Sequence, residues 1–393
     1  MSHTNLTVYG ATWCSDCKRA KKFLGEQRVH YNWVDVEEDA AGLALVEKVN
    51  HGKRIIPTIV FDDDSVLIEP SNAELAQKLG LPTRAKCDYY DLICIGGGPA
   101  SLTAALYAAR EGLEVLVIEK SGLGGQAGVT EQLDNFPGFP EGIAGAEFAD
   151  RLVRQARRFG VELLQAQEVI GLRAEAESKY VTTADDAEYG ARAVLIATGS
   201  TYRRLGVPGE DDLIGAGVHF CATCDGPFYK GQHVAVIGGG NSAGEESLFL
   251  TRFADQVTIL VRGPQLSASK IVIDKVTSDP KIVVRYNTEV VELHGESRLS
   301  GITLRDQTTG VTEKIEPAAA FVFIGLFPNS RWLPAEIERD QAGFIMTQLN
   351  LETTLPGVFA AGDVRLGSTK QAASAVGEGA TAALMIREYL KTI

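Results

Sequence analysis

The sequence contains no apolar run approaching the ~18 residues that a membrane-spanning helix needs. Its first five residues lack the basic and apolar segments of a signal peptide, which favours a cytoplasmic protein. Histidine is scarce, with six residues among 393 and no cluster of metal-ligand spacing, so we expect no metal site. Basic residues are too few to balance the acidic ones, and the formal net charge of −13 argues against nucleic acid or an anionic membrane as a partner.

Composition and length are those of an ordinary globular protein. Apolar residues make up 45% of the chain and charged residues 23%. A chain of 393 residues is long enough for about two to four domains. The six cysteines comprise two pairs, Cys14/Cys17 and Cys221/Cys224, and the single Cys87 and Cys94. In a reducing compartment, paired cysteines are more often catalytic or metal-binding than structural.

The central pair, Cys221 and Cys224, is a candidate two-electron switch, because cysteines separated by two residues can close into a disulfide and reopen. Asp225 follows at once and supplies a proton donor or acceptor for thiol chemistry. Taken alone, the pair is also compatible with half of a zinc site or with a buried structural pair.

The first cysteine pair lies between a predicted strand, residues 6–10, and a predicted helix, residues 18–25. This order puts Cys14 at or just before a helix amino terminus, where unpaired N–H groups stabilise a thiolate. Lys18 adds a positive side chain nearby. We therefore expect Cys14 to be the attacking thiol and Cys17 the resolving one.

Further predicted strands at 31–36 and 55–61 and a helix at 73–79 complete a βαβαββα order. With the cysteine pair and Ile56-Pro57-Thr58, residues 4–81 resemble the glutaredoxin branch of the thioredoxin fold, and most closely its mycoredoxin-type members. The resemblance implies a cis Pro57 beside the dithiol, with a backbone edge open to an incoming chain; the alternative is that Pro57 only ends a strand. The acidic turn at 62–64 disfavours glutathione, an anionic tripeptide.

A short polar linker, residues 83–89, comes after this first domain, residues 1–82. Six extended residues reach only ~20 Å, so the front domain is tethered close to the rest of the chain. Cys87 lies in the linker, either incidentally or as an accessory redox thiol.

A strand at 90–95, a glycine loop, a helix through residue 110 and a strand at 114–118 that ends in Glu119 form a dinucleotide-binding pattern. The glycines allow a pyrophosphate to sit at the helix amino terminus, and Glu119 can accept a hydrogen bond from a ribose hydroxyl. Ser101 stands where the usual fingerprint has its third glycine. Cys94, in the middle of the strand, is expected to be core packing.

Further motifs follow along the chain: Gly124-Gly125-Gln126 after the second strand, residues 134–138, Ala197-Thr198-Gly199 at the end of a buried strand, residues 358–363, and Lys370-Gln371-Ala372 at the start of a final helix. With these motifs in this order, residues 90–393 resemble the low-molecular-weight thioredoxin reductases. The resemblance implies an FAD-binding domain, residues 90–204 and 328–393, interrupted by an inserted domain, residues 205–327. The positions implied to hold FAD are Gly96, Gly98, Pro99, Ala100, Ser101, Glu119, Gly125, Gln126, Asn135, Ala197, Thr198, Gly199, Gly362, Asp363, Lys370, Gln371 and Ala372. The family usually has Arg at the position of Lys370.

The inserted domain repeats the strand, glycine loop and helix, with the candidate contacts Gly238, Gly240, Asn241, Ser242, Ala243 and Arg262. Val261 occupies the position that corresponds to Glu119, and Arg262 is beside it. Loss of the acid and gain of a base favour a 2′-phosphate, hence NADPH. The family usually has three arginines here, so NADH or another donor such as ferredoxin remain alternatives.

The resemblance also assigns roles: Cys224 approaches the flavin, Cys221 attacks the substrate disulfide and Asp225 moves protons. The inserted domain must then rotate, with hinges near 205–209 and 325–328. The overall fold class is α/β, a thioredoxin-fold domain followed by two Rossmann-like domains, the second inserted into the first. The resemblance also suggests a homodimer.

The favoured function is a disulfide reductase that passes electrons from NADPH through FAD and Cys221/Cys224 to Cys14/Cys17, and then to a protein or low-molecular-weight disulfide. One alternative gives the reductase a separate thioredoxin or peroxiredoxin as its partner. Another is a redox-responsive binding protein that docks a partner through the Pro57 edge.

Overall fold

The computed structural model describes residues 6–27, 29–130, 132–133 and 135–393, apart from the side chains of Lys22, Glu26 and Cys224. Two predictions therefore fall outside the described residues: the absence of a signal peptide, which concerned residues 1–5, and the role of the Cys224 side chain. The chain divides into two compact units. The first comprises Met1–Val129, Gly145–Gly199 and Pro328–Ile393, and the second comprises Thr130–Ala144 and Ser200–Phe327.

The first unit begins with a front module built on a four-stranded sheet of order β2-β1-β3-β4, in which β1 runs parallel to β2 and antiparallel to β3. Its elements are β1 (Leu6–Gly10), α1 (Ser15–Glu26), β2 (Tyr31–Asp35), α2 (Ala40–Val49), β3 (Thr58–Phe61), β4 (Val66–Ile68) and α3 (Asn72–Lys78). Strand β3 begins at Thr58, three residues later than predicted, because Pro57 has no N–H with which to pair. The Ile56–Pro57 bond is cis, as the resemblance implied.

The remainder of the first unit, residues 89–129, 145–199 and 328–393, is where the resemblance implies FAD, and we call it the flavin part. Hydrogen bonds hold the linker along it. The Pro82 carbonyl accepts from the Gln165 amide at 3.0 Å, and the Lys86 amide donates to the Glu162 carboxylate at 2.8 Å. Only residues 79–81 separate helix α3 from Pro82, and three residues span about 10 Å. The front module is thus tethered by much less free chain than the linker sequence predicts.

The flavin part of the first unit is a sheet of order β10-β11-β12-β5-β6-β9, with β23 also paired to β12. Strands β5 and β6 are almost continuously apolar and buried, as parallel strands covered on both faces are. The strands are β5 (Tyr89–Ile95), β6 (Val115–Ile118), β9 (Glu162–Leu164), β10 (Val169–Glu175), β11 (Ser178–Thr183), β12 (Glu188–Ile196) and β23 (Val358–Ala360). The helices are α4 (Pro99–Arg110), α5 (Gly125–Val129), α6 (Gly145–Arg158), η2 (Gly362–Val364) and α11 (Ala372–Leu390).

The second unit has a five-stranded parallel sheet of order β14-β21-β15-β16-β17 and a three-stranded antiparallel sheet of β18, β19 and β20. The parallel strands are β14 (Val218–His219), β15 (His233–Ile237), β16 (Gln256–Leu260), β17 (Ile282–Arg285) and β21 (Ala319–Val322). The other strands are β7 (Gln132–Leu133), β8 (Ile143–Ala144), β13 (Ser200–Tyr202), β18 (Thr288–Gly295), β19 (Leu299–Asp306), β20 (Thr312–Ile315) and β22 (Leu326–Pro328). The helices are α7 (Glu210–Leu213), α8 (Ala222–Asp225), η1 (Gly226–Tyr229), α9 (Asn241–Leu250) and α10 (Lys270–Ser278).

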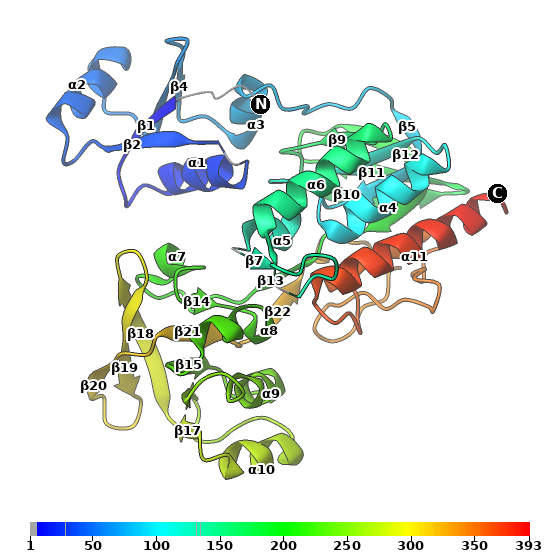
Figure 1. Ribbon diagram of the computed structural model, residues 1–393. Helices are drawn as coiled ribbons and strands as arrows, with labels where there is room; N and C mark the ends of the chain where they lie inside the picture. Colours follow the sequence, from blue (N-terminus) through cyan, green and yellow to red (C-terminus); the bar gives the residue numbers. More distant parts are fainter. Residues whose placement is uncertain (1–5, 28, 131, 134) are drawn as a thin grey trace. The chain divides into compact units, whose positions relative to one another are not determined.

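Helices α4 and α11 of the first unit lie side by side (Figure 1). Their contact depends on Gly379, because a Cβ atom there would lie 2.2 Å from the backbone oxygen of Ala100. A glycine at this position therefore serves the packing: it lets α11 approach the first turn of α4, which begins at the glycine loop.

Replacing Gly379 with Ala should lower the free energy of unfolding by about 1–3 kcal/mol, since the helices must separate. Gly377, two residues earlier in α11, is a matched control, since a Cβ there would meet no described heavy atom within 4 Å. Gly377→Ala should raise the free energy of unfolding by about 0.5–1 kcal/mol. Denaturant unfolding followed by circular dichroism checks both values, and equal effects of the two substitutions would contradict the packing argument.

Candidate active site

The first glycine loop joins β5 to α4. Gly96 has a φ of +101°, and a Cβ atom there would lie 2.4 Å from the Ala197 carbonyl oxygen, so only glycine lets these backbones approach. Gly98 is the N-cap of the twelve-residue α4, and a Cβ at Gly98 would meet no described heavy atom within 4 Å. A bound group could therefore approach the amino terminus of α4 at Gly98 without meeting a side chain there.

Glu119, at the end of β6, lies beneath this loop. Its carboxylate accepts hydrogen bonds from the Gly97 amide at 2.5 Å and from the Ser121 amide at 2.7 Å. A Cβ at Gly97 would lie 3.0 Å from the Glu119 Cβ. The acid is therefore at the carboxyl edge of the sheet beside the loop, where a ribose hydroxyl of a bound dinucleotide would meet it.

Three distant segments converge on the same loop. A Cβ at Gly125, the first residue of α5, would lie 3.1 Å from the Gly98 Cα, and the Gly124 amide donates to the Gly97 carbonyl at 2.8 Å. A Cβ at Gly362 would lie 3.2 Å from the Ala100 Cβ. The predicted positions 96–101, 119, 125, 197–198 and 362 are thus brought together, whereas Asn135 belongs to the second unit.

The turn after β23 is held by Glu378 and Arg365, which the sequence alone did not single out, and by Lys370, which it did. Glu378 of α11 accepts from the Gly362 amide at 2.7 Å and pairs with both Arg365 Nε, at 3.2 Å, and Arg365 Nη2, at 2.8 Å. Lys370 Nζ donates to the carbonyls of Asp363, at 2.8 Å, and Arg365, at 3.2 Å. Because a lysine can make these contacts, the family's usual arginine is not needed to fix this turn.

Asp363 and Lys370 are both withdrawn from water. Burial raises the pKa of the Asp363 carboxyl, and the Lys370 charge opposes that rise. Burial lowers the pKa of the Lys370 ammonium, and Asp363 opposes that shift. Gln371 is the N-cap residue of α11, and Ala372 is the first residue of the helix, as predicted.

The second glycine loop repeats the first, position by position. A Cβ at Gly238 would lie 2.4 Å from the Phe323 carbonyl oxygen, and one at Gly239 would lie 2.9 Å from Val261 Cγ1. Gly240 is the N-cap of α9, and a Cβ there would meet no described heavy atom within 4 Å. Val261 therefore takes the place that Glu119 has in the first loop, as the sequence predicted.

The surroundings of Val261 are only weakly basic. Arg262 is exposed, and its charge contributes to lowering the pKa of Glu289, although the main cause is the hydrogen bond from Arg305. The Ser269 amide donates to Asn241 Oδ1 at 2.7 Å, which joins the segment after β16 to the first residue of α9. Arg262 is the basic residue that directly follows Val261 in the chain.

The central cysteine pair lies at a one-turn helix. Cys221 is disulfide-bonded and immediately precedes α8. Asp225, the last residue of α8, has its Oδ2 3.4 Å from His219 Nδ1. The other ring nitrogen of His219 lies 2.7 Å from the Tyr229 hydroxyl. His219 was not among the predicted residues; the available signal was a histidine two positions before Cys221.

The front pair has the predicted geometry. Cys14 is the N-cap residue of α1, and its Sγ accepts from the Cys17 amide at 3.2 Å. Cys14 keeps 7% of its surface exposed and Cys17 none. Burial, reinforced by the hydrogen bond with Cys14, raises the pKa of Cys17 to about 12. Trp13, with 65% of its surface exposed, adjoins Cys14 in the chain.

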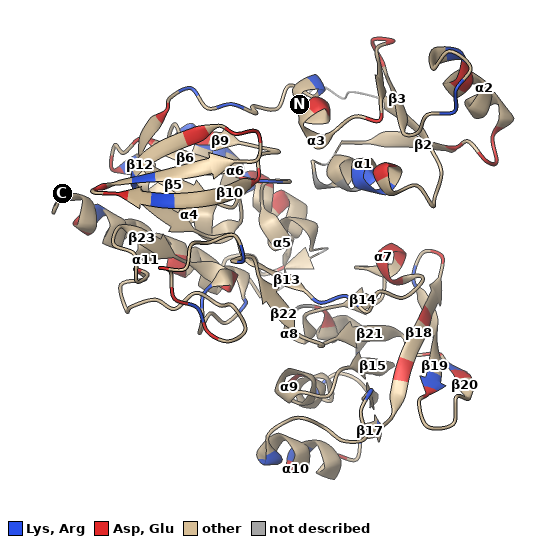
Figure 2. Cartoon of the chain, turned by 180° about the vertical axis from the view of Figure 1, so that it is seen from behind, with Lys and Arg blue, Asp and Glu red and all other residues tan. Residues whose placement is uncertain are grey.

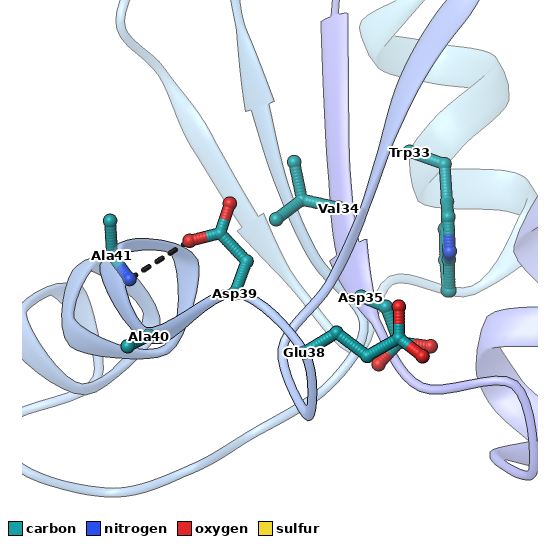
Figure 3. Close-up of a pocket in the computed structure, with 7 residues that line it drawn as sticks. All are labelled: Trp33, Val34, Asp35, Glu38, Asp39, Ala40 and Ala41. Atoms are coloured by element: carbon teal, nitrogen blue, oxygen red, sulfur yellow. Dashed lines mark hydrogen bonds between the residues drawn. The ribbon is translucent and has the colours of Figure 1, made fainter.

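Charge is unevenly distributed over the front module (Figure 2). Helix α1 carries lysine and arginine, whereas the segment between β2 and α2 is acidic. A pocket beside this acidic segment is lined by Trp33, Val34, Asp35, Glu38, Asp39, Ala40 and Ala41 (Figure 3). Asp39 caps α2 by accepting from the Ala41 and Gly42 amides, both at 2.9 Å. Cys14 and Cys17 are not among the residues that line this pocket, and the carboxylates of the pocket disfavour an anionic ligand.

Residues 90–379 match the family described as pyridine nucleotide-disulphide oxidoreductase, and residues 6–66 match glutaredoxin. A thioredoxin reductase of Treponema pallidum is 40% identical over 304 residues, covering 77% of this chain and 98% of that protein. A bifunctional thioredoxin reductase/thioredoxin of Mycobacterium leprae is 42% identical over 302 residues, covering 77% of this chain and 66% of that protein. The crystal structure of a Streptococcus pyogenes thioredoxin reductase matches with a TM-score of 0.74 and 38% identity, covering 78% of this chain and 99% of that one.

Glycine loops at two helix amino termini, each closing the end of a parallel sheet, are the framework of a two-dinucleotide oxidoreductase. The chain belongs to the pyridine nucleotide-disulphide oxidoreductases, within their thioredoxin reductase group, and carries a glutaredoxin domain at its front. It is a flavoprotein disulfide reductase that uses FAD and NADPH. Among the described residues, no helix is long and apolar enough to cross a membrane.

The two thiols Cys17 and Cys87 should differ sharply in reactivity. A pKa of about 12 leaves Cys17 with about a thousandfold less thiolate than a thiol at the ordinary value near 9, and it is fully buried, whereas Cys87 is exposed. Iodoacetamide at pH 8, followed by peptide mass spectrometry of the reduced protein, should label Cys87 well before Cys17. Labelling of both at one rate would show that Cys17 lacks this buried environment.

Proposed function

We propose that this reductase passes electrons from NADPH through FAD and the Cys221/Cys224 pair to Cys14/Cys17, and from there to an external disulfide. The observation that carries the proposal is the front dithiol itself. Cys14 caps a helix amino terminus, as an attacking thiol should, and it lies in a module tethered by an anchored linker to the flavin part.

When bound, NADPH and FAD would supply the reducing equivalents by hydride chemistry, two electrons per turnover. The overall reaction consumes NADPH, one proton and one disulfide, and yields NADP⁺ and two thiols. The chain's part is to hold both dinucleotides. Gly98, with the α4 amino terminus and Glu119, would hold FAD, and Gly240, with the α9 amino terminus, would hold NADPH.

The exchange between the two dithiols follows from access to sulfur. Cys17 is fully buried, so an incoming thiolate from Cys221 attacks Cys14 and breaks the bond between Cys14 and Cys17. The mixed disulfide is then resolved by Cys224, which forms a bond with Cys221 and leaves Cys14 and Cys17 as thiols. In the same proposal Asp225 accepts or returns the proton.

The Mycobacterium leprae relative supports a reductase joined to its own dithiol carrier, because its name combines thioredoxin reductase with thioredoxin. The Treponema pallidum relative favours a second candidate, a reductase with a separate partner, because this chain covers 98% of that protein with residues outside the front module. In that case thioredoxin or a peroxiredoxin would take electrons from Cys221.

Three features stay predictions. We expect a homodimer, by resemblance to the family. We expect hinge motion at residues 205–209 and 325–328, where Gly206, Gly209 and Gly325 have positive φ. We also expect the reaction to take place in the cytoplasm, where thiol pairs are kept reduced.

Cys14→Ser should abolish NADPH-dependent reduction of the final disulfide while reduction of the flavin by NADPH continues, since the relay is broken at its last step. Cys87→Ser is the control, because Cys87 is a free, exposed thiol of the linker. Stopped-flow absorbance of the flavin and steady-state NADPH consumption measure the two steps. Unchanged turnover in Cys14→Ser would remove the front module from the path and favour a separate protein acceptor.

Arg262→Gln should weaken NADPH binding about tenfold to a hundredfold, because a charge-assisted hydrogen bond to a phosphate contributes about 1.5–3 kcal/mol. The KM for NADH should stay the same, since NADH has no 2′-phosphate, and NADH is therefore the internal control. Steady-state kinetics with both nucleotides give the two values. Equal changes in KM for NADPH and NADH would mean that Arg262 does not contact the phosphate.

A further inference from the structure

A carboxylate, an imidazole and a phenol lie in sequence beside the central disulfide of the second unit. Asp225 Oδ2 is 3.4 Å from His219 Nδ1, and His219 Nε2 is 2.7 Å from the Tyr229 hydroxyl. His219 has only 6% of its surface exposed. Phe321, on the neighbouring strand β21, packs against both rings, with centroids 5.3 Å from His219 and 5.8 Å from Tyr229. The imidazole is therefore held in one place by both neighbours and by an apolar face.

This arrangement allows His219 to gain a proton without losing either neighbour. In the neutral tautomer with its proton on Nδ1, that N–H faces Asp225 and Nε2 accepts from the Tyr229 hydroxyl. In the protonated ring, Nε2–H donates to the same hydroxyl, which can turn and accept. Histidine is the side chain that most often changes its charge in the physiological pH range. His233, by contrast, lies against the hydroxyl of Thr258, a neutral partner.

The titratable groups in contact with His219 are Asp225 from α8 and Tyr229 from η1. Cys221 follows His219 by two residues, and its backbone carbonyl accepts from the Asp225 amide at 3.1 Å. Strand β21 contributes the neutral Phe321. Asp225 shares one helical turn with the cysteine pair. When His219 is neutral, the negative charge of Asp225 is uncompensated, and a second negative charge on a sulfur of this turn is unfavourable. When His219 is protonated, the pair with Asp225 has no net charge, and a thiolate forms more easily.

We propose that His219 is a positioning residue for Asp225 that binds one proton when the Cys221 disulfide is reduced and releases it when the dithiol passes its electrons on. Reduction by two electrons breaks the S–S bond. Of the two protons taken up, one protonates a sulfur and the other resides on His219, which leaves one sulfur as thiolate. The source of the electrons is the reductase reaction itself, so the inference rests on the proposed role of Cys221 and Asp225, but not on transfer to the front module.

The test compares the alkylation of Cys221 in the full-length holoprotein, reduced with dithiothreitol and freed of it anaerobically, between pH 5.5 and 9. Cys14→Ser and Cys17→Ser are included throughout, so that failure of the electron relay does not affect the result. Iodoacetamide labelling of the Cys221 peptide, measured by mass spectrometry, is the readout. His219→Gln keeps a side chain able to hydrogen-bond but unable to take up a proton, and His233→Gln is the matched control.

In the parent protein, the plot of the Cys221 labelling rate against pH should show a shoulder below pH about 7. His219→Gln should lack this shoulder, with labelling rates there about three- to tenfold lower than in the parent. The two profiles should meet at the alkaline end of the range, because a neutral imidazole gives the Cys221 thiolate no advantage. His233→Gln should reproduce the parent profile. Superimposable profiles for His219→Gln and the parent, or a loss by one constant factor at every pH, would overturn the proposal.

Tyr229→Phe provides a second measurement if His219→Gln does not fold. It removes the hydroxyl that accepts from protonated His219, so the shoulder should shrink in the same direction by a smaller factor. A Tyr229→Phe profile identical to that of the parent would contradict the proposal on its own.

Discussion

Contact between backbones at two glycine loops is the constraint on which the cofactor-binding part of this reductase depends. Gly96 faces the carbonyl of Ala197, and Gly238 faces that of Phe323; in both places a Cβ atom would lie 2.4 Å from the oxygen. Any side chain would push the loop away from the neighbouring strand end. Because no side chain is present, each loop delivers a helix amino terminus to open space at the edge of a parallel sheet, where a pyrophosphate can bind.

The two loops then differ in what stands beside them. Glu119 supplies a carboxylate that holds the Gly97 amide, whereas Val261 presents an apolar side chain to Gly239. In the proposed assignment, the same backbone device would hold two dinucleotides with different riboses, and the position at the end of the second strand, Glu119 or Val261, would distinguish them. The two dithiols also share a local geometry, because Cys14 and Cys221 each directly precede a helix.

Local patterns predicted much of this arrangement. The position of Cys14 at the start of α1 followed from strand, loop and helix propensities, and the correspondence of Val261 with Glu119 followed from counting along two equivalent units. The triad of Asp225, His219 and Tyr229 was not predictable, because its members meet only when β14, α8 and η1 pack together. The anchoring of Pro82 and Lys86 escaped prediction for a similar reason, since both contact residues about 80 positions away.

The central claim is that electrons leave the flavin part through a covalent exchange between Cys221 and Cys14. Cys17→Ser combined with Cys224→Ser removes both resolving thiols, so the exchange should stop at its intermediate. Peptide mass spectrometry under non-reducing conditions, after oxidation with a mild disulfide, would then find a Cys14–Cys221 cross-link in most of the protein. If Cys14 and Cys221 instead form disulfides only with the added reagent, the front module does not receive electrons from the central pair.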